Sequence, residues 1–145
     1  MPLKFLSPIH KASRQMTIYL EGETLELGVS PVEGHLLSFL RTYAPSPVSE
    51  LERVFGHKRS TLTSMLDRLS DRGLLTRQIN ADDRRSFTIE LTADGRKLAG
   101  KLEKKLQAFE QRLNDRINDK QMAGFQAVME AIADVTDVTV REREI

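Results

Sequence analysis

The segment spanning residues 49–95 constrains the fold more than any other part of the chain. It holds two helical patterns back to back, then a Gly73 stop, a short strand pattern, a charged turn that contains Arg84 and Arg85, and a second strand pattern. Two adjacent helices followed by a β-hairpin are typical of a winged helix-turn-helix. We therefore predict a mostly α-helical fold with a small β-hairpin wing.

Capping and turn residues divide the rest of the chain into helices. Ser7 is the expected N-cap of a first helix, and Gly22 is expected to end that helix and begin a loop. Ser30 and Glu33, with Pro31 between them, predict a capping box at the start of a second helix. The pattern predicts an N-terminal helix that leads into the winged part of the chain.

The hairpin follows two shorter helices. Ser46-Pro47 is expected to open the first of these, and Gly73 closes the second. Residues 74–79 and 87–91 then read as two strands on either side of the charged turn. Alternation along the return strand predicts three inward side chains: Phe87, Ile89 and Leu91.

Two long helices complete the pattern, one starting at Thr92 and one after Asn118. Their apolar stripes give more helix surface than a small winged core can cover, and monomers avoid large exposed apolar patches. We expect a homodimer interface at Ile9, Met16, Leu106, Leu113, Ile117, Phe125, Met129 and Ile132. The alternative is an intramolecular hairpin of the two C-terminal helices packed on the first helix. The expected organisation is an N-terminal helix (residues 1–29), a winged domain (30–95) and dimerisation helices (96–145).

The composition narrows the classes of protein. The chain has 145 residues, of which 39% are hydrophobic and 30% charged, and it has no cysteine. It therefore fits one domain without disulfides or thiolate metal sites. No apolar run approaches the ~18 residues of a membrane span, and the first residues lack the apolar core of a secretory signal. We expect a cytoplasmic protein with no cofactor and no membrane partner.

Positive charge is concentrated in the winged segment. Residues 53–85 carry eight basic and four acidic side chains, a net charge of +4, whereas the whole chain has +1. The fourth helix combines an apolar stripe with a polar side of cations and hydroxyls: Lys58, Arg59, Ser60, Thr61, Thr63, Ser64 and Arg68. Short hydroxyl side chains let a helix approach base edges closely. This side is a candidate DNA-reading surface, although an ordinary solvated Ser/Thr-rich face would look the same.

The charged turn strengthens the DNA hypothesis. An arginine at the tip of a thin hairpin can enter the minor groove, where the negative potential attracts it. The candidate residues of the wing and its strand are Arg77, Asp83, Arg84 and Arg85. The alternative is a solvated turn held by Asp–Arg pairs.

The chain resembles the MarR family of winged-helix transcriptional regulators. The resemblance rests on RSTLTSMLDRLSDRGLLTR (residues 59–77) and DDRRSFTIELTADGRKL (residues 82–98). It implies a homodimer, most often a repressor, on a pseudo-palindromic operator with half-sites about 10 bp apart. It also implies that the recognition helix enters the major groove and that Arg84 or Arg85 enters the minor groove. Asn80-Ala81 and Ser64 depart from the common family pattern, so base preference does not carry over.

The resemblance also implies release from DNA by a small aromatic or anionic effector. Candidate lining residues are Met16, Tyr19, His35 and Phe39, each of which also suits a plain core or interface position. The three histidines are too scattered for a metal triad, and no catalytic motif is present. We therefore expect no enzyme, and the competing function is a winged-helix protein-interaction module or anti-regulator that does not itself bind DNA.

Overall fold

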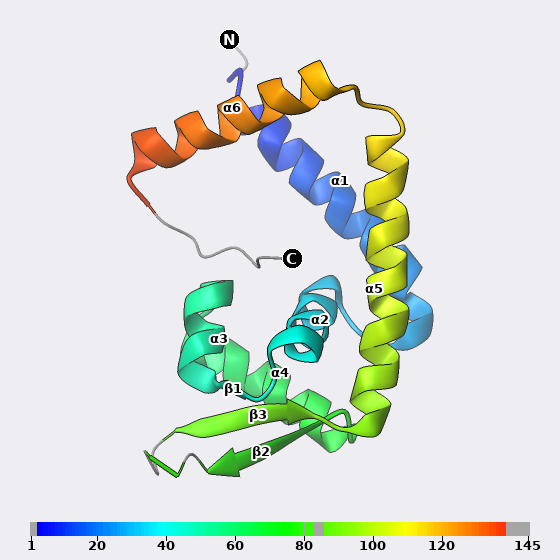
Figure 1. Cartoon of the computed structure of the whole chain (residues 1–145), viewed down its shortest axis with the longest axis vertical. Coiled ribbons are helices and arrows are strands. Elements are labelled where there is room, and N and C mark those ends of the chain that lie inside the picture. Colours follow the sequence, from blue (N-terminus) through cyan, green and yellow to red (C-terminus); the bar gives the residue numbers. More distant parts are fainter. Residues whose placement is uncertain (1–2, 80, 83–85, 139–145) are drawn as a thin grey trace.

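A computed structural model describes residues 3–79, 81–82 and 86–138. The elements in chain order are α1 (Leu6–Thr24), η1 (Leu25–Leu27), α2 (Pro31–Tyr43), β1 (Ser46–Pro47), α3 (Val48–Phe55), α4 (Arg59–Asp71), β2 (Leu75–Ile79), β3 (Phe87–Leu91), α5 (Ala93–Asn114) and α6 (Asp119–Thr136). Figure 1 shows α2, α3, α4 and the sheet gathered at one end, with α5 rising away from them and α6 crossing the far end. The mostly helical winged fold is as predicted.

The wing belongs to a three-stranded antiparallel sheet with the order β1-β3-β2. The hairpin pairs Leu75 with Leu91 and Ile79 with Phe87, which confirms the two predicted strands. The third strand was missed: Ser46 pairs with Ile89. Ser46 therefore does not open a helix, and the N-cap of α3 is Pro47.

Three local predictions were wrong. Helix α1 begins at Leu6, before Ser7, and no side chain caps it. It also continues through Gly22 to Thr24, because one glycine lowers helix stability by only about 1 kcal/mol. Phe87 lies at the outer end of β3 and is 40% exposed, whereas Ile89 is buried as expected.

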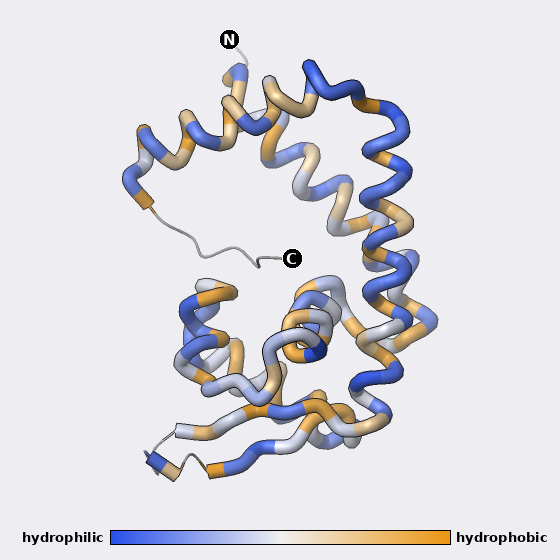
Figure 2. Tube along the Cα trace, viewed as in Figure 1, coloured by the Kyte–Doolittle hydropathy of each residue, from blue (hydrophilic) through white to orange (hydrophobic). Residues whose placement is uncertain are grey.

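The core lies inside the winged part of the molecule. Leucines from α2, α3, α4, β2 and α5 meet Ile89 of β3, and each of these side chains is fully buried: Leu36, Leu37, Leu40, Leu51, Leu62, Leu69, Leu75 and Leu102. Helix α6 buries none of its residues, and apolar and polar positions are interspersed along it in Figure 2. The C-terminal helices therefore do not form the intramolecular hairpin considered as the alternative to a dimer.

Two adjoining turns fix α4, β2 and α5 relative to one another. After α4, Gly73 adopts a left-handed conformation (φ +72°), and the N–H of Leu74 donates to the carbonyl of Leu69 at 3.0 Å, as in a Schellman motif. Leu74 then accepts from the N–H of Thr92 at 3.1 Å, and the Thr92 hydroxyl caps α5 by accepting from Gly95. The C-terminal end of α4, the candidate DNA-reading helix, is thus tied to the start of α5.

Candidate nucleic-acid interface

The polar side of α4 faces solvent as the sequence predicts. Its apolar stripe, Leu62, Met65, Leu66 and Leu69, is buried in the core. The opposite side exposes every candidate: Arg59, Ser60, Thr61, Thr63, Ser64 and Arg68, with Lys58 as the N-cap. The structure therefore brings these seven residues together on one surface.

The first turn of α4 has free hydrogen-bond donors. Lys58 caps the helix without a side-chain hydrogen bond, so the first backbone N–H groups have no capping side chain among the described residues. Such groups and the helix dipole favour a phosphate at this end. Within the described parts of the chain, Lys58 makes no ion pair. This end of α4 suits a DNA backbone contact.

The hydroxyls on α4 differ in what they offer a base. The Ser64 hydroxyl donates to the Ser60 carbonyl at 3.0 Å, so it keeps only its acceptor lone pairs for a ligand. Among the described residues, Thr61 and Thr63 have no side-chain hydrogen bond and can both donate and accept. The two threonines are therefore the more versatile groups for reading base edges.

Two of the arginines on α4 are already paired with acidic residues. Arg59 lies 3.5 Å from Glu52, and both groups are accessible to solvent. Arg68 lies 3.3 Å from Glu33, whose side chain is only 7% exposed. Because the Glu33 carboxylate is buried, releasing Arg68 from it would leave a buried charge unpaired. Arg68 therefore has a structural partner that the sequence did not reveal.

Arg77, predicted as a strand contact, links β2 to α4. Its Nη2 forms an ion pair with Asp67 of α4. Among the described residues its Nε is buried without a hydrogen-bond partner. The pair braces the helix against the wing strand. Asp67 was not among the candidates, because a partner ten residues away along the chain leaves no local signal.

The tip of the wing, with Asp83, Arg84 and Arg85, lies outside the described residues. The strand ends that carry it are described: Ile79 is 63% exposed, and Phe87 stands opposite it. Figure 1 shows these ends projecting beyond the core, away from α5. The described ends of β2 and β3 are therefore the part of the hairpin farthest from α5.

The candidate dimer residues are spread over α1, α5, α6 and the connection between α5 and α6, and none of them is buried within the chain. Ile9 and Met16 lie exposed on α1, and Leu113 on α5. Leu106 of α5 and Ile132 of α6 are half-buried. The remaining three, Ile117, Phe125 and Met129, are exposed in or near α6. Most of these apolar side chains are therefore exposed in a single chain.

The effector candidates have different surroundings. Phe39 of α2 is buried and its ring contacts Tyr43 and Phe55. Tyr19 of α1 instead packs on Phe109, with ring centroids 5.3 Å apart. Met16 and His35 are exposed. These contacts place Phe39 in the core and Tyr19 at the junction of α1 and α5.

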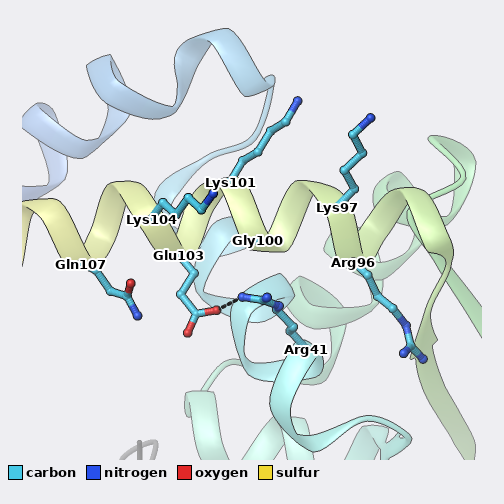
Figure 3. Close-up of a pocket in the computed structure, with 8 residues that line it drawn as sticks. All are labelled: Arg41, Arg96, Lys97, Gly100, Lys101, Glu103, Lys104 and Gln107. Carbon is cyan, nitrogen blue, oxygen red and sulfur yellow. Dashed lines mark hydrogen bonds and ion pairs between the residues drawn. The ribbon is translucent and has the colours of Figure 1, made fainter.

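A basic cleft of about 480 Å³ lies elsewhere, between α5 and the end of α2. Arg41 of α2 forms an ion pair there with Glu103 of α5. In Figure 3, Lys97 and Lys101 extend from the other side of α5 and point away from Arg41. The cations around this cleft therefore do not converge on one point, as an anion site would require.

The winged part matches a known family. The model of the MarR family matches residues 29–87, which run from the residue before the Ser30 cap through α2, α3, α4 and β2 to the start of β3. Over these residues the chain is similar to the MarR family. This match confirms the resemblance drawn from the sequence motifs.

Two curated relatives from Bacillus subtilis (strain 168) share part of the chain. The HTH-type transcriptional repressor MdtR is 35% identical over 68 residues, covering 47% of this chain and 44% of MdtR. The uncharacterized HTH-type transcriptional regulator YfiV is 30% identical over 76 residues, covering 52% of this chain and 48% of YfiV. The match thus spans about half the length of each relative. Both are named as transcriptional regulators, in agreement with the prediction of no enzyme.

The MarR-type fold extends over most of the chain. The S. aureus MepR–DNA complex superposes with a TM-score of 0.87 at 18% identity and covers 92% of this chain and 99% of MepR. A mutant MarR from E. coli complexed with operator DNA gives a TM-score of 0.78 at 23% identity, covering 87% of this chain and 91% of that MarR chain.

The described residues hold no helix long and apolar enough to cross a membrane.

Proposed function

We propose that this chain is a transcriptional regulator that binds a specific double-stranded DNA sequence through α4. The exposed polar face of α4 carries the proposal, because a firmly docked helix presents free N–H groups, Lys58 and two unbonded threonines on one surface. A major groove admits such a helix and offers donors and acceptors to its side chains. The fold shared with MepR and E. coli MarR, each solved with DNA, supports this proposal.

In this proposal the wing supplies a second contact. Arg84 or Arg85 enters the minor groove next to the half-site, and Asp82 or Asp83 holds one of them in place. The brace between Arg77 and Asp67 fixes the angle between the hairpin and α4. A helix and a loop held at a fixed angle read one continuous stretch of duplex.

We further propose that the active form is a homodimer. The exposed apolar side chains of α1, α5 and α6 support this assembly. Within one chain α1 buries only Leu20 and Thr24, and α6 buries no residue. Two α4 helices would then read half-sites about 10 bp apart. Repression is the proposed mode, in line with the name of MdtR. Release by a small aromatic or anionic effector near Tyr19 remains part of the proposal.

The decisive experiment is selection of bound duplexes from random DNA, followed by anisotropy titrations of the best site. We expect a two-fold symmetric consensus and an affinity that falls steeply with salt, as counterion release demands. A winged helix used only for protein contact would return no consensus at low salt. That result would replace the DNA proposal with the protein-interaction function.

The wing has its own test. Replacing Arg85 by alanine should weaken binding to the selected site by about tenfold and lower its salt dependence, since one minor-groove cation is lost. Arg84→Ala is the companion variant and should have the smaller effect. Unchanged affinity for both variants would remove the wing from the interface.

A further inference from the structure

Two arginines on one side of α4 hold the connection between α1 and α2. Arg72, the C-cap of α4, donates from Nη1 to the carbonyl of Gly28 at 2.6 Å and from Nη2 to that of Leu27 at 3.3 Å. One turn earlier, Arg68 pairs with the buried Glu33, whose other carboxylate oxygen accepts from the N–H of Ser30. Both ends of the α1–α2 connection are thus bonded to α4.

The carbonyls that Arg72 meets are suited to a cation. Leu27 ends η1, which follows α1 directly, and Gly28 is its left-handed cap with φ +70°. The last carbonyls of a helical segment lack intrahelical partners and carry partial negative charge. A planar guanidinium can bond two of them at once, which an ammonium cannot do with the same geometry. A Cβ added to Gly28 would lie 3.2 Å from Arg72 Nη2, so the fit is close.

Helix α1 is otherwise loosely tied to the winged core. It buries only Leu20 and Thr24. Its side chains also reach α5, where the Tyr19 ring packs on Phe109 and the Tyr19 hydroxyl accepts from Arg112 at 2.7 Å. A continuous set of contacts therefore runs from α5 through α1 and η1 to Arg72. A shift of α1 that carries η1 with it moves the carbonyls to which Arg72 is bonded.

We propose that Arg72 is a positioning residue that sets the orientation of α4 relative to α1. A rearrangement of α1 then reaches the DNA-reading helix through two hydrogen bonds from one side chain. Arg68 and Glu33 form the second anchor, which keeps the start of α2 in register with the same face of α4. The effect of Arg72 on DNA affinity rests on the proposed function, whereas its effect on the orientation of α4 relative to α1 does not.

The orientation can be measured without DNA. The chain has no cysteine, so spin labels at Lys11→Cys on α1 and Thr61→Cys on α4 report one distance by pulsed electron paramagnetic resonance. Labelled chains are diluted with excess unlabelled chain, so that a dimer carries a single labelled pair. We expect one narrow distribution for the parent, a broadened or shifted one for Arg72→Ala, and an intermediate one for Arg72→Lys.

The control is Arg96→Ala, which removes another exposed arginine, one that lies 3.6 Å from Glu90. It should leave the distribution unchanged. If Arg72→Ala does not fold, as judged by circular dichroism, Arg72→Lys carries the same test. Parent-like distributions for every folded Arg72 variant would overturn the proposal.

A second arm measures affinity for the selected duplex. Arg72→Ala should bind about tenfold more weakly, the size of a typical coupling between sites, and Arg72→Lys should recover part of the loss. An affinity equal to that of the parent, with a changed distance, would contradict transmission to the reading helix. A parent that binds no duplex refutes the proposed function and leaves the distance result to stand by itself.

Discussion

Replacing glycine by alanine at two positions of α5 should change stability in opposite directions. Gly95 lies in the first turn of α5, and a Cβ built there would lie 1.9 Å from the carbonyl oxygen of Leu74. Gly100 lies in the middle of the same helix, where a Cβ would meet nothing closer than the Arg41 guanidinium at 3.8 Å. The chemical change is the same at both sites. The difference between the two changes in the free energy of unfolding therefore isolates the close approach at Gly95.

The magnitude at Gly95 follows from the backbone that must move. Overpacking of a buried site costs about 1–3 kcal/mol, and a rigid carbonyl puts Gly95→Ala at the upper end. Moving Leu74 also breaks its hydrogen bond from the N–H of Thr92, worth about 1 kcal/mol. Alanine regains at most about 1 kcal/mol of helix propensity. We expect Gly95→Ala to lose about 3 kcal/mol and Gly100→Ala to gain about 0.5–1 kcal/mol.

Thermal and urea unfolding, at one fixed chain concentration, measure both values. For a chain of this size Tm shifts by about 3 °C per kcal/mol, so Gly95→Ala should melt about 9 °C lower and Gly100→Ala about 2 °C higher. If Gly95→Ala were as stable as the parent, the approach of α5 to Leu74 would be looser than described. The link between the end of α4 and the start of α5 would then not explain why glycine occupies this position.

Three further outcomes are expected. Thr61→Ala should change the selected consensus, at a cost of about 1–3 kcal/mol at one base pair, and Ser64→Ala should change it less, because the Ser64 proton is already donated within α4; an unchanged consensus for both variants would exclude these two hydroxyls from base reading. Ile132→Glu should convert the dimer to monomer on a sizing column and abolish specific binding, with Gln126→Glu on the same helix as the control; a dimeric Ile132→Glu chain would contradict the proposed interface. Ser30→Ala should lower the free energy of unfolding by about 1 kcal/mol through loss of the capping box, and an unchanged urea midpoint would refute that value.

The sequence predicted those features whose bonds close within a few residues. The capping box of Ser30 and Glu33, the end of a helix at Gly73, and the helix starts at Thr92 and after Asn118 are all confirmed. Each rests on a hydrogen bond or a backbone conformation that the local residues specify. Helix starts without such a bond were less predictable, as the uncapped start of α1 before Ser7 demonstrates.

Features that depend on distant residues were not predictable from one sequence. Ser46 becomes a strand residue because it pairs with Ile89, far along the chain. The partners of Arg68, Arg72 and Arg77 are likewise set by the packing of separate elements. Hydrophobic periodicity places an arginine on the polar side of a helix, but that side is wide enough to face either DNA or a neighbouring element.

These partners change how the basic segment should read DNA. Its net charge of +4 suggests that arginines dominate the contact, yet the structure commits several of them to the scaffold. Arg68 neutralises the buried Glu33, so moving it to a phosphate would leave a buried carboxylate without its cation. Arg72 would have to give up its two hydrogen bonds to the carbonyls of Leu27 and Gly28. Arg59, in an exposed pair with Glu52, can exchange partners at little cost. If α4 binds DNA as proposed, base discrimination would therefore fall to its threonines, while Arg68 and Arg72 hold the helix in place.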